Sequence, residues 1–246
     1  MNDRIKRRYV SELRRENAEQ TRLRIAEAAR ALMLERGYAA TTMAEVARVA
    51  GVAVQTLYAS CPGGKPGLAK LVYDVSLAGD AQPIPQDARP EVSAIVAEPD
   101  PVRKLAGYAA MAVAIFERVG PVRRVLRIAA GAAGAGAAGL DDLLAETERQ
   151  RRVGSRGPAE HLAETGALRA GLGVDRAADQ IYALTSIELF ERLTEVCGWS
   201  VVEFRDWLAE TLVSVLLDTE RRVSAGRSCS DLGCQGLYAY SMSVKK

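Results

Sequence analysis

The chain has 246 residues, of which 48% are apolar and 26% are charged, an ordinary balance for a soluble globular protein of one or two domains. Its longest uncharged apolar run, Leu105 to Phe116, is far shorter than the ~20 residues needed to cross a bilayer. No apolar segment follows the basic N-terminus, as a secretory signal would require. We therefore expect no membrane partner and a cytoplasmic location.

Positive charge is concentrated at the start of the chain, although the net charge is only +2. Residues 1–80 hold 13 Lys and Arg against 9 Asp and Glu, which gives +4 there and leaves −2 for the rest. The excess is largest in residues 1–18, which we expect to form a basic, flexible arm. Such arms neutralise phosphates or enter a minor groove of DNA. A solvated tail explains the same charge equally well.

Cysteine and histidine usage gives no sign of an enzyme. Cys61, Cys197, Cys229 and Cys234 are scattered without a CxxC pair or a neighbouring histidine, which predicts free thiols and no metal site. The single histidine, His161, lies in a polar segment with no nucleophile pattern nearby. No nucleotide-binding glycine motif follows a strand. We expect no catalytic residues and no cofactor.

Helical periodicity dominates the first third of the chain. A first helix is expected at about 19–36, ended by Gly37, and it is followed by helices at about 43–50, 54–60 and 65–79. Five prolines between positions 81 and 101 then predict an irregular connection between two domains, because proline cannot occupy a helix interior without cost.

The remainder also reads as helix. We expect helices at about 101–118, 121–130, 140–153, 158–165, 175–196 and 200–222, with a Gly/Ala junction at 131–139 and a poorly ordered tail over 223–246. The last two helices are long and amphipathic. They either pack against a second copy as a four-helix interface or complete the core of the monomer, and periodicity does not separate these alternatives.

The segment from Thr41 to Lys70 carries the functional signal. Thr42 followed by Glu45 forms a capping box at the start of one short helix, and Gly51 supplies the positive φ of a tight turn. A second short helix then turns Leu57 inward and leaves Gln55, Thr56 and Tyr58 facing outward. Two short helices across a glycine turn are typical of a helix-turn-helix unit, whose second helix enters a major groove of DNA.

The run TRLRIAEAARALMLERGYAATTMAEVARVAGVAVQTLY resembles the N-terminal DNA-binding domain of the TetR family of transcriptional regulators. The segment GALRAGLGVDRAADQIYALTSIELFERLTEVCGWSVVEFRDWLAETL is similar, more loosely, to the last two helices of one branch of that family. The resemblance implies an all-α protein. Its N-terminal three-helix helix-turn-helix domain, 19–80, would be followed by a larger helical ligand-binding and dimerisation domain, 81–222.

Specific roles follow from the resemblance. It implies contacts to a palindromic double-stranded DNA operator from Thr42, Gln55, Thr56, Tyr58, Ser60 and Lys65. It also implies a homodimer formed through helices 175–196 and 200–222. An unknown small-molecule inducer would lie among the helices between about 101 and 170. Tyr108, Met111 and Phe116 are candidates to line that pocket, and an ordinary core role is at least as good an explanation for them.

Three departures from the family pattern concern the recognition helix. Ala53 stands where the family usually has a capping Ser or Thr, and Cys61 stands where it has Phe. Pro62, Gly63 and Gly64 make the following turn one residue longer. These changes predict a recognition helix that is held less firmly. They support an alternative, a helical adaptor of the same fold with weakened or lost DNA binding.

Overall fold

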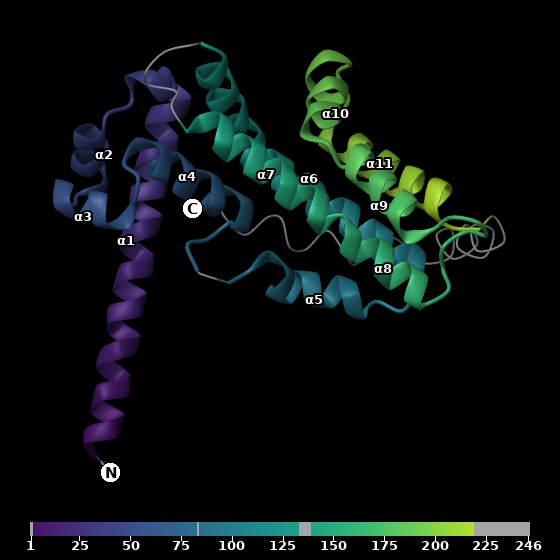
Figure 1. The fold of residues 1–246 in the computed structure, drawn as a ribbon, viewed down its shortest axis with the longest axis horizontal. Helices are drawn as coiled ribbons and strands as arrows, with labels where there is room; N and C mark the ends of the chain where they lie inside the picture. Colours follow the sequence, from purple (N-terminus) through teal and green to yellow (C-terminus); the bar gives the residue numbers. More distant parts are fainter. Residues whose placement is uncertain (1, 83, 133–138, 219–246) are drawn as a thin grey trace. The chain divides into compact units, whose positions relative to one another are not determined.

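The computed structural model describes residues 2–82, 84–132 and 139–218 (Figure 1). Within these ranges the chain is mostly helical and contains no strand, apart from an isolated bridge between Leu168 and Leu217. Two compact units are present: Met1–Ser93 with Met111–Arg151, and Ala94–Ala110 with Arg152–Lys246. The all-α prediction is confirmed. The predicted domain limits at 80 and 222 stay a prediction, and the predicted tail from 223 lies outside the described residues.

Four helices at the start of the chain pack together in the first unit: α1 (Asn2–Ala40), α2 (Met43–Ala50), α3 (Val54–Ser60) and α4 (Lys65–Ala78) (Figure 1). α1 contacts α2 and α4, and α2 contacts α3. Their common core is made of almost fully buried side chains, which are Ile25, Ala29, Met33, Val46, Leu57, Leu68 and Val72. α2 and α3 have the predicted bounds, and α4 ends one residue before the predicted position.

α1 begins far earlier than the sequence indicated. We expected a helix from about residue 19 after a flexible arm, whereas the backbone is helical from Asn2. The segment lacks Gly and Pro and is rich in helix-forming Arg, so nothing in it interrupts a helix that the core has nucleated. At the other end Gly37 has φ 81° and ψ 165°, and it breaks the regular helix where the sequence predicted, before a last turn that reaches Ala40.

The proline-rich segment is more ordered than we expected. It contains the 3₁₀ turn η1 (Gln86–Ala88) and the helix α5 (Pro90–Ala97). Pro90 is the first residue of α5, a position where the missing N–H costs nothing because it would have no partner in the helix. The prediction of an irregular connection is therefore wrong for this part of it.

The two helices predicted at 101–118 and 121–130 form one helix, α6 (Pro101–Gly131), with Pro121 inside it. Proline in a helix interior removes one hydrogen bond and costs ~3 kcal/mol. Val119, Val122 and Leu126 are buried on either side of Pro121, and their burial offsets that cost. By length and composition α6 could also span a bilayer, a test that the core helix of a soluble protein passes as well.

Later parts of α6 pack in the first unit with α4 and with α7 (Leu140–Gly154). The Arg118 guanidinium donates from Nε to the carbonyl of Ser76 at 3.0 Å and from Nη2 to that of Leu77 at 3.1 Å. These carbonyls lie at the C-terminus of α4, where helix carbonyls lack partners of their own. Arg118 therefore closes the end of α4, and burial lowers the pKa of its guanidinium.

The second unit contains α8 (Arg156–Glu164), α9 (Val174–Leu184), α10 (Ile187–Glu191), the π-helical turn η3 (Arg192–Val196) and α11 (Val201–Leu216). α9 contacts α8 and α11. The helix predicted at 175–196 is thus three elements, because Ser186 accepts a hydrogen bond from the Leu189 N–H and starts a new helix. The helix predicted at 200–222 begins at Val201, after the Ser200 capping box, and ends at Leu216.

Candidate nucleic-acid interface

The α2–α3 unit is built around local hydrogen bonds that the sequence specifies. The Thr42 hydroxyl accepts from the Glu45 N–H at 3.2 Å and caps α2. Gly51 has φ 65° and ψ 38°, and the Val52 N–H donates to the Ala47 carbonyl at 3.0 Å. This Gly51 backbone is left-handed and favours glycine, so the chain turns tightly from α2 into α3.

Only half of the predicted capping box forms. Glu45 does not return to the Thr42 backbone; its carboxylate pairs with the Arg36 guanidinium at 2.5 Å. The charged donor at the end of the regular part of α1 competes successfully with a backbone N–H, because a hydrogen bond between ions is the stronger one. The pKa of Arg36 is raised, first by its hydrogen bond to Glu35 and then by the two carboxylate charges.

α3 presents a polar face that no described part of the chain covers. Leu57 is fully buried and anchors the helix, whereas Gln55, Thr56 and Tyr58 are exposed, Tyr58 with 52% of its surface accessible. Val54, at the first position of α3, is 40% exposed beside them. The predicted arrangement of Leu57 inward and three polar side chains outward is present. Val54 was missed because an apolar residue next to a helix start looks like core in a sequence.

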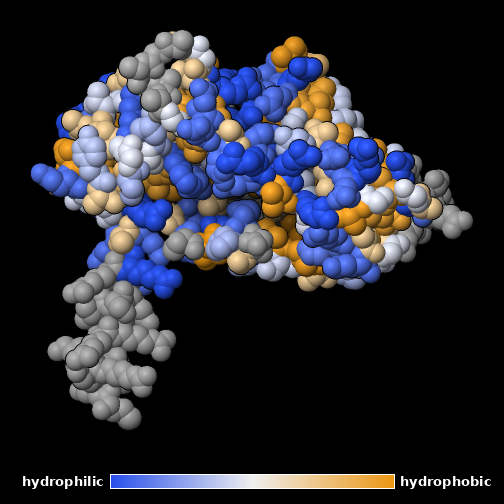
Figure 2. Space-filling view, viewed as in Figure 1, coloured by the Kyte–Doolittle hydropathy of each residue, from blue (hydrophilic) through white to orange (hydrophobic). Residues whose placement is uncertain are grey.

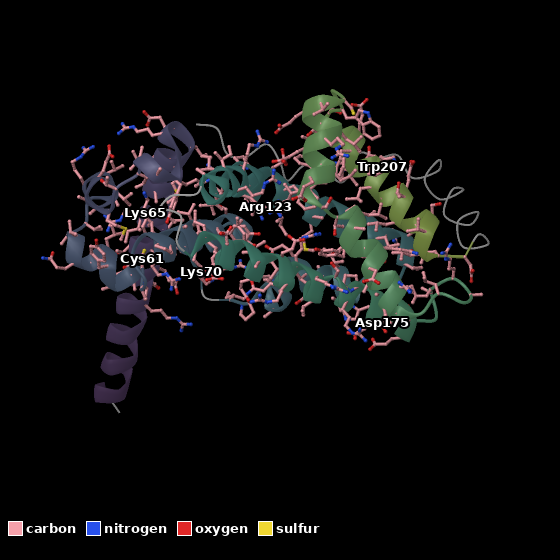
Figure 3. The ribbon with its side chains drawn as sticks, turned by 45° about the horizontal axis from the view of Figure 1, so that its top comes forward. Cys61, Lys65, Lys70, Arg123, Asp175 and Trp207 are labelled. Atoms are coloured by element: carbon pink, nitrogen blue, oxygen red, sulfur yellow. The ribbon has the colours of Figure 1, made fainter. Side chains whose placement is uncertain are left out.

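The turn between α3 and α4 replaces a large side chain by close backbone packing. Cys61 ends α3 and is 1% exposed, and burial raises the pKa of its thiol to about 11. Gly63 and Gly64 both have positive φ. Gly67, on the first turn of α4, lies so close to this turn that an added Cβ would meet the Pro62 carbonyl oxygen at 2.0 Å. Figure 3 labels Cys61 and Lys65 on either side of the turn.

Three of the residues predicted to contact DNA have local partners within the unit. The Lys65 ammonium donates to the Ala39 carbonyl at 2.9 Å and lies 4.5 Å from the centre of the Tyr38 ring, and burial lowers its pKa. Ser60 is half-buried and its hydroxyl donates to the Thr56 carbonyl at 2.9 Å. Thr42 is exposed, with its oxygen engaged as the cap of α2.

The candidate ligand residues lie on α6, and none of them lines either of the two hollows found in the described chain. Tyr108 and Met111 are half-buried, and Phe116 is 4% exposed. Two surface hollows are present in the described residues. One of about 360 Å³ is lined by Trp199, Glu203, Asp206, Trp207 and Glu210. The other, of about 270 Å³, lies in the first unit between Arg22, the end of α4 and the 80–89 segment. Neither includes any of the three α6 residues.

Sequence comparison gives one family match. Residues 25–60 match the model of the bacterial regulatory proteins of the tetR family, from within α1 to the end of α3. A comparison with curated proteins finds no match.

Solved structures of the same fold are numerous. A TetR-family regulator described as putative, from Rhodococcus sp., aligns with a TM-score of 0.61 at 18% identity, over 80% of this chain and 98% of that one. NalD, the secondary repressor of the MexAB-OprM multidrug efflux pump in Pseudomonas aeruginosa, aligns with a TM-score of 0.56 at 20% identity, over 82% and 98%. SmeT in complex with triclosan gives 0.57 at 17% identity, over 82% and 93%.

These comparisons agree with the architecture. At such identities the solved structures establish the fold, which is an N-terminal helix-turn-helix domain followed by a helical C-terminal domain. The family match falls on α1–α3, the segment that presents Gln55, Thr56 and Tyr58. Regulators of this family are transcription factors and not enzymes. Residues 25–60 therefore match the model of the tetR family of bacterial regulatory proteins, and the described chain shares the fold of solved TetR-family structures.

Proposed function

We propose that the protein is a sequence-specific DNA-binding transcriptional regulator that acts in the cytoplasm as a repressor and is released from its operator by a small molecule. The observation that carries this proposal is the exposed face of α3. Gln55, Thr56 and Tyr58 project from a helix that is anchored by the buried Leu57. A glutamine side chain can bind the N6 and N7 edge of adenine, threonine can contact a base or a thymine methyl, and tyrosine can donate to phosphate.

Val54 extends this face. A β-branched apolar side chain at the start of a recognition helix can pack against a thymine methyl group in the major groove. The face is flanked by Thr42, Ser60 and Lys65, each of which already makes a local hydrogen bond. To contact DNA, each would either keep that bond and add a second one or give up the local bond. Their expected contribution is phosphate contact and orientation, whereas Gln55 is expected to read sequence.

The test is a binding titration of the purified protein on DNA from the region upstream of its own gene, at several salt concentrations. Gln55→Ala is expected to lose about 5- to 150-fold in preference for one base pair, the equivalent of ~1–3 kcal/mol for a bidentate base contact. Gln150→Ala, on the exposed face of α7, removes the same side chain elsewhere and serves as the control. Equal affinity of wild type and Gln55→Ala for every sequence would contradict the proposal and favour the adaptor alternative.

We propose that two copies pair through α9, α10, η3 and α11, which replace the helices 175–196 and 200–222 of the sequence analysis. Exposed apolar side chains lie at this end of the second unit, with Val196 80% and Val202 46% accessible. A dimer would place two copies of α3 against successive major grooves, about 34–36 Å apart, and would therefore read a palindrome. Val202→Asp is expected to shift the protein toward monomer in light-scattering measurements, and an unchanged mass would contradict this interface.

We propose α6 as one wall of the inducer pocket, with Tyr108, Met111 and Phe116 as lining residues. The SmeT structure holds triclosan, an aromatic, largely apolar ligand, and an apolar α6 face fits a ligand of that class. An inducer that weakens operator binding must be bound less tightly by the operator complex, by the same factor. Titrations in both orders test this equality, and a ligand that binds without any effect on operator affinity would contradict the inducer role.

A further inference from the structure

The N-terminal half of α1 extends beyond the core of the first unit. α1 is helical from Asn2, and among its described side chains, from Arg15 onward, Ile25 is the first that is buried. The described side chains from Arg15 to Arg24 are exposed or half-buried and mostly hydrophilic (Figure 2). At 1.5 Å per residue the segment before Ile25 is a rod of about 35 Å.

Four arginines of this segment share one face of the helix. Arg4, Arg8, Arg15 and Arg22 are spaced by four, seven and seven residues, so at 100° per residue they fall within about 40° of one another. Arg7 and Arg14 border this basic stripe on one side. The nearest acidic positions, Glu12, Glu16 and Glu19, lie about 20–120° round the helix on the other side, and Glu19 pairs with Arg15 at 3.6 Å. Lys6 and Arg24 are on the opposite face. We call Arg4, Arg8, Arg15 and Arg22 the basic stripe.

The stripe leads to the candidate interface. Arg22 is close enough to the end of α3 for its charge to lower the pKa of the Cys61 thiol, against the larger effect of burial. Arg22 also lines the hollow beside α4. The stripe therefore runs along α1 from its first turn to the α3–α4 side of the first unit. A polyanion bound at α3 could extend along α1 over several phosphate spacings.

We propose that the basic stripe is a second DNA-binding element, which contacts the phosphates that flank the bases read by α3. The inference rests on the proposed DNA-binding function. A basic arm can either contact phosphates or enter the minor groove. An α-helix is 10–12 Å wide and the minor groove is only ~6 Å wide, so a helical arm favours phosphate contact. The stripe accordingly lies against the sugar-phosphate backbone and adds affinity that does not depend on sequence.

The experiment compares two charge-matched double variants of the full chain. Arg4→Gln with Arg8→Gln removes two members of the stripe, and Lys6→Gln with Arg24→Gln removes two cations from the opposite face. Each is titrated with a fluorescent 30-base-pair duplex from the upstream region, and with an unrelated duplex of the same length, across a range of salt concentrations. Helicity measured by circular dichroism checks that both variants fold like the wild type.

The stripe variant is expected to reduce the slope of log affinity against log salt by about 1.8, because each phosphate contact contributes ~0.9. It should weaken both duplexes by the same factor, and the opposite-face variant should retain the wild-type slope. Equal losses of DNA affinity in the two variants would overturn the proposal, because total charge alone would then explain binding. Unchanged affinity in the stripe variant would overturn it as well. A wild type without preference for its upstream duplex would overturn the proposed function instead, whatever the slopes.

Discussion

Gly67 offers the sharpest test of how the recognition helix is attached to α4. The substitution Gly67→Ala adds one methyl group on the first turn of that helix. In an open helix position this change stabilises a protein by up to ~1 kcal/mol, because alanine is the better helix former. At position 67 the new Cβ would meet the Pro62 carbonyl oxygen at 2.0 Å and the Pro62 carbonyl carbon at 2.9 Å.

The two effects have opposite signs, and the contact is the larger. Real Cβ atoms do not approach oxygen to 2.0 Å, so the backbone of the α3–α4 turn has to move. Overpacking costs ~1–3 kcal/mol, and a contact as short as 2.0 Å to a backbone oxygen belongs in the upper part of that range, ~2–3 kcal/mol. After the helix-forming gain of up to ~1 kcal/mol, a net loss of about 1–2 kcal/mol remains. For a protein of this size the melting temperature should fall by roughly 2–8 °C.

Gly157→Ala is the matched control. Gly157 is the second residue of α8, and no atom lies within 4 Å of its added Cβ. Calorimetric unfolding of the two variants and the wild type gives the comparison, and the control should unfold at or above the wild-type temperature. If Gly67→Ala were as stable as the wild type or more stable, the close approach of Pro62 to α4 would be wrong.

Three further perturbations probe the same unit. Ala53→Ser should stabilise it by about 0.5–1 kcal/mol in thermal unfolding, because Ala53 already has the extended backbone of a cap and lacks only the oxygen; a loss would contradict that geometry. Arg89 lowers the pKa of Asp80 through a hydrogen bond, so this contribution to stability is present above the pKa of an unfolded Asp and is lost as pH falls. The free energy of unfolding should therefore depend less on pH between about pH 2 and 5 in Asp80→Asn than in the wild type. The same pH dependence in both proteins would contradict the pair. In a variant whose other cysteines are serine, Cys61 should react with a thiol reagent at pH 8 only on unfolding, because its raised pKa keeps the thiol protonated; fast labelling of the native protein would show that it is not buried.

Local chemistry explains which elements could be predicted from the sequence. The bounds of α2 and α3 follow from a threonine cap, a glycine that requires positive φ and an apolar residue that must face inward, and all three signals lie within 20 residues. The exposure of Gln55, Thr56 and Tyr58 follows from the same pattern, because a seven-residue helix with Leu57 buried has little choice of face.

Side-chain partners that are distant in the sequence could not be predicted from it. Glu45 pairs with Arg36 rather than with the Thr42 backbone, and Lys65 donates to Ala39. Both partners lie on α1, and the period of a helix does not specify which cation meets which carbonyl. Pro121 was read as a helix start for a similar reason, since only the packing of its neighbours reveals that the helix continues through it.

The departures around residue 61 form one coordinated change. A phenylalanine at this position would fill the space between α3 and α4 with a ring, whereas Cys61 fills much less and is nevertheless 1% exposed. The space is closed by backbone: Gly63 and Gly64 adopt positive φ, and Gly67 has no side chain where the Pro62 carbonyl lies. A Cβ at position 67 would meet backbone atoms of both Pro62 and Cys61, so the turn is closely packed against α4. It follows that Cys61→Phe alone should lower the melting temperature of the unit, although it restores the residue that the family pattern favours, because position 61 is already buried in a closely packed turn and a ring would overpack it.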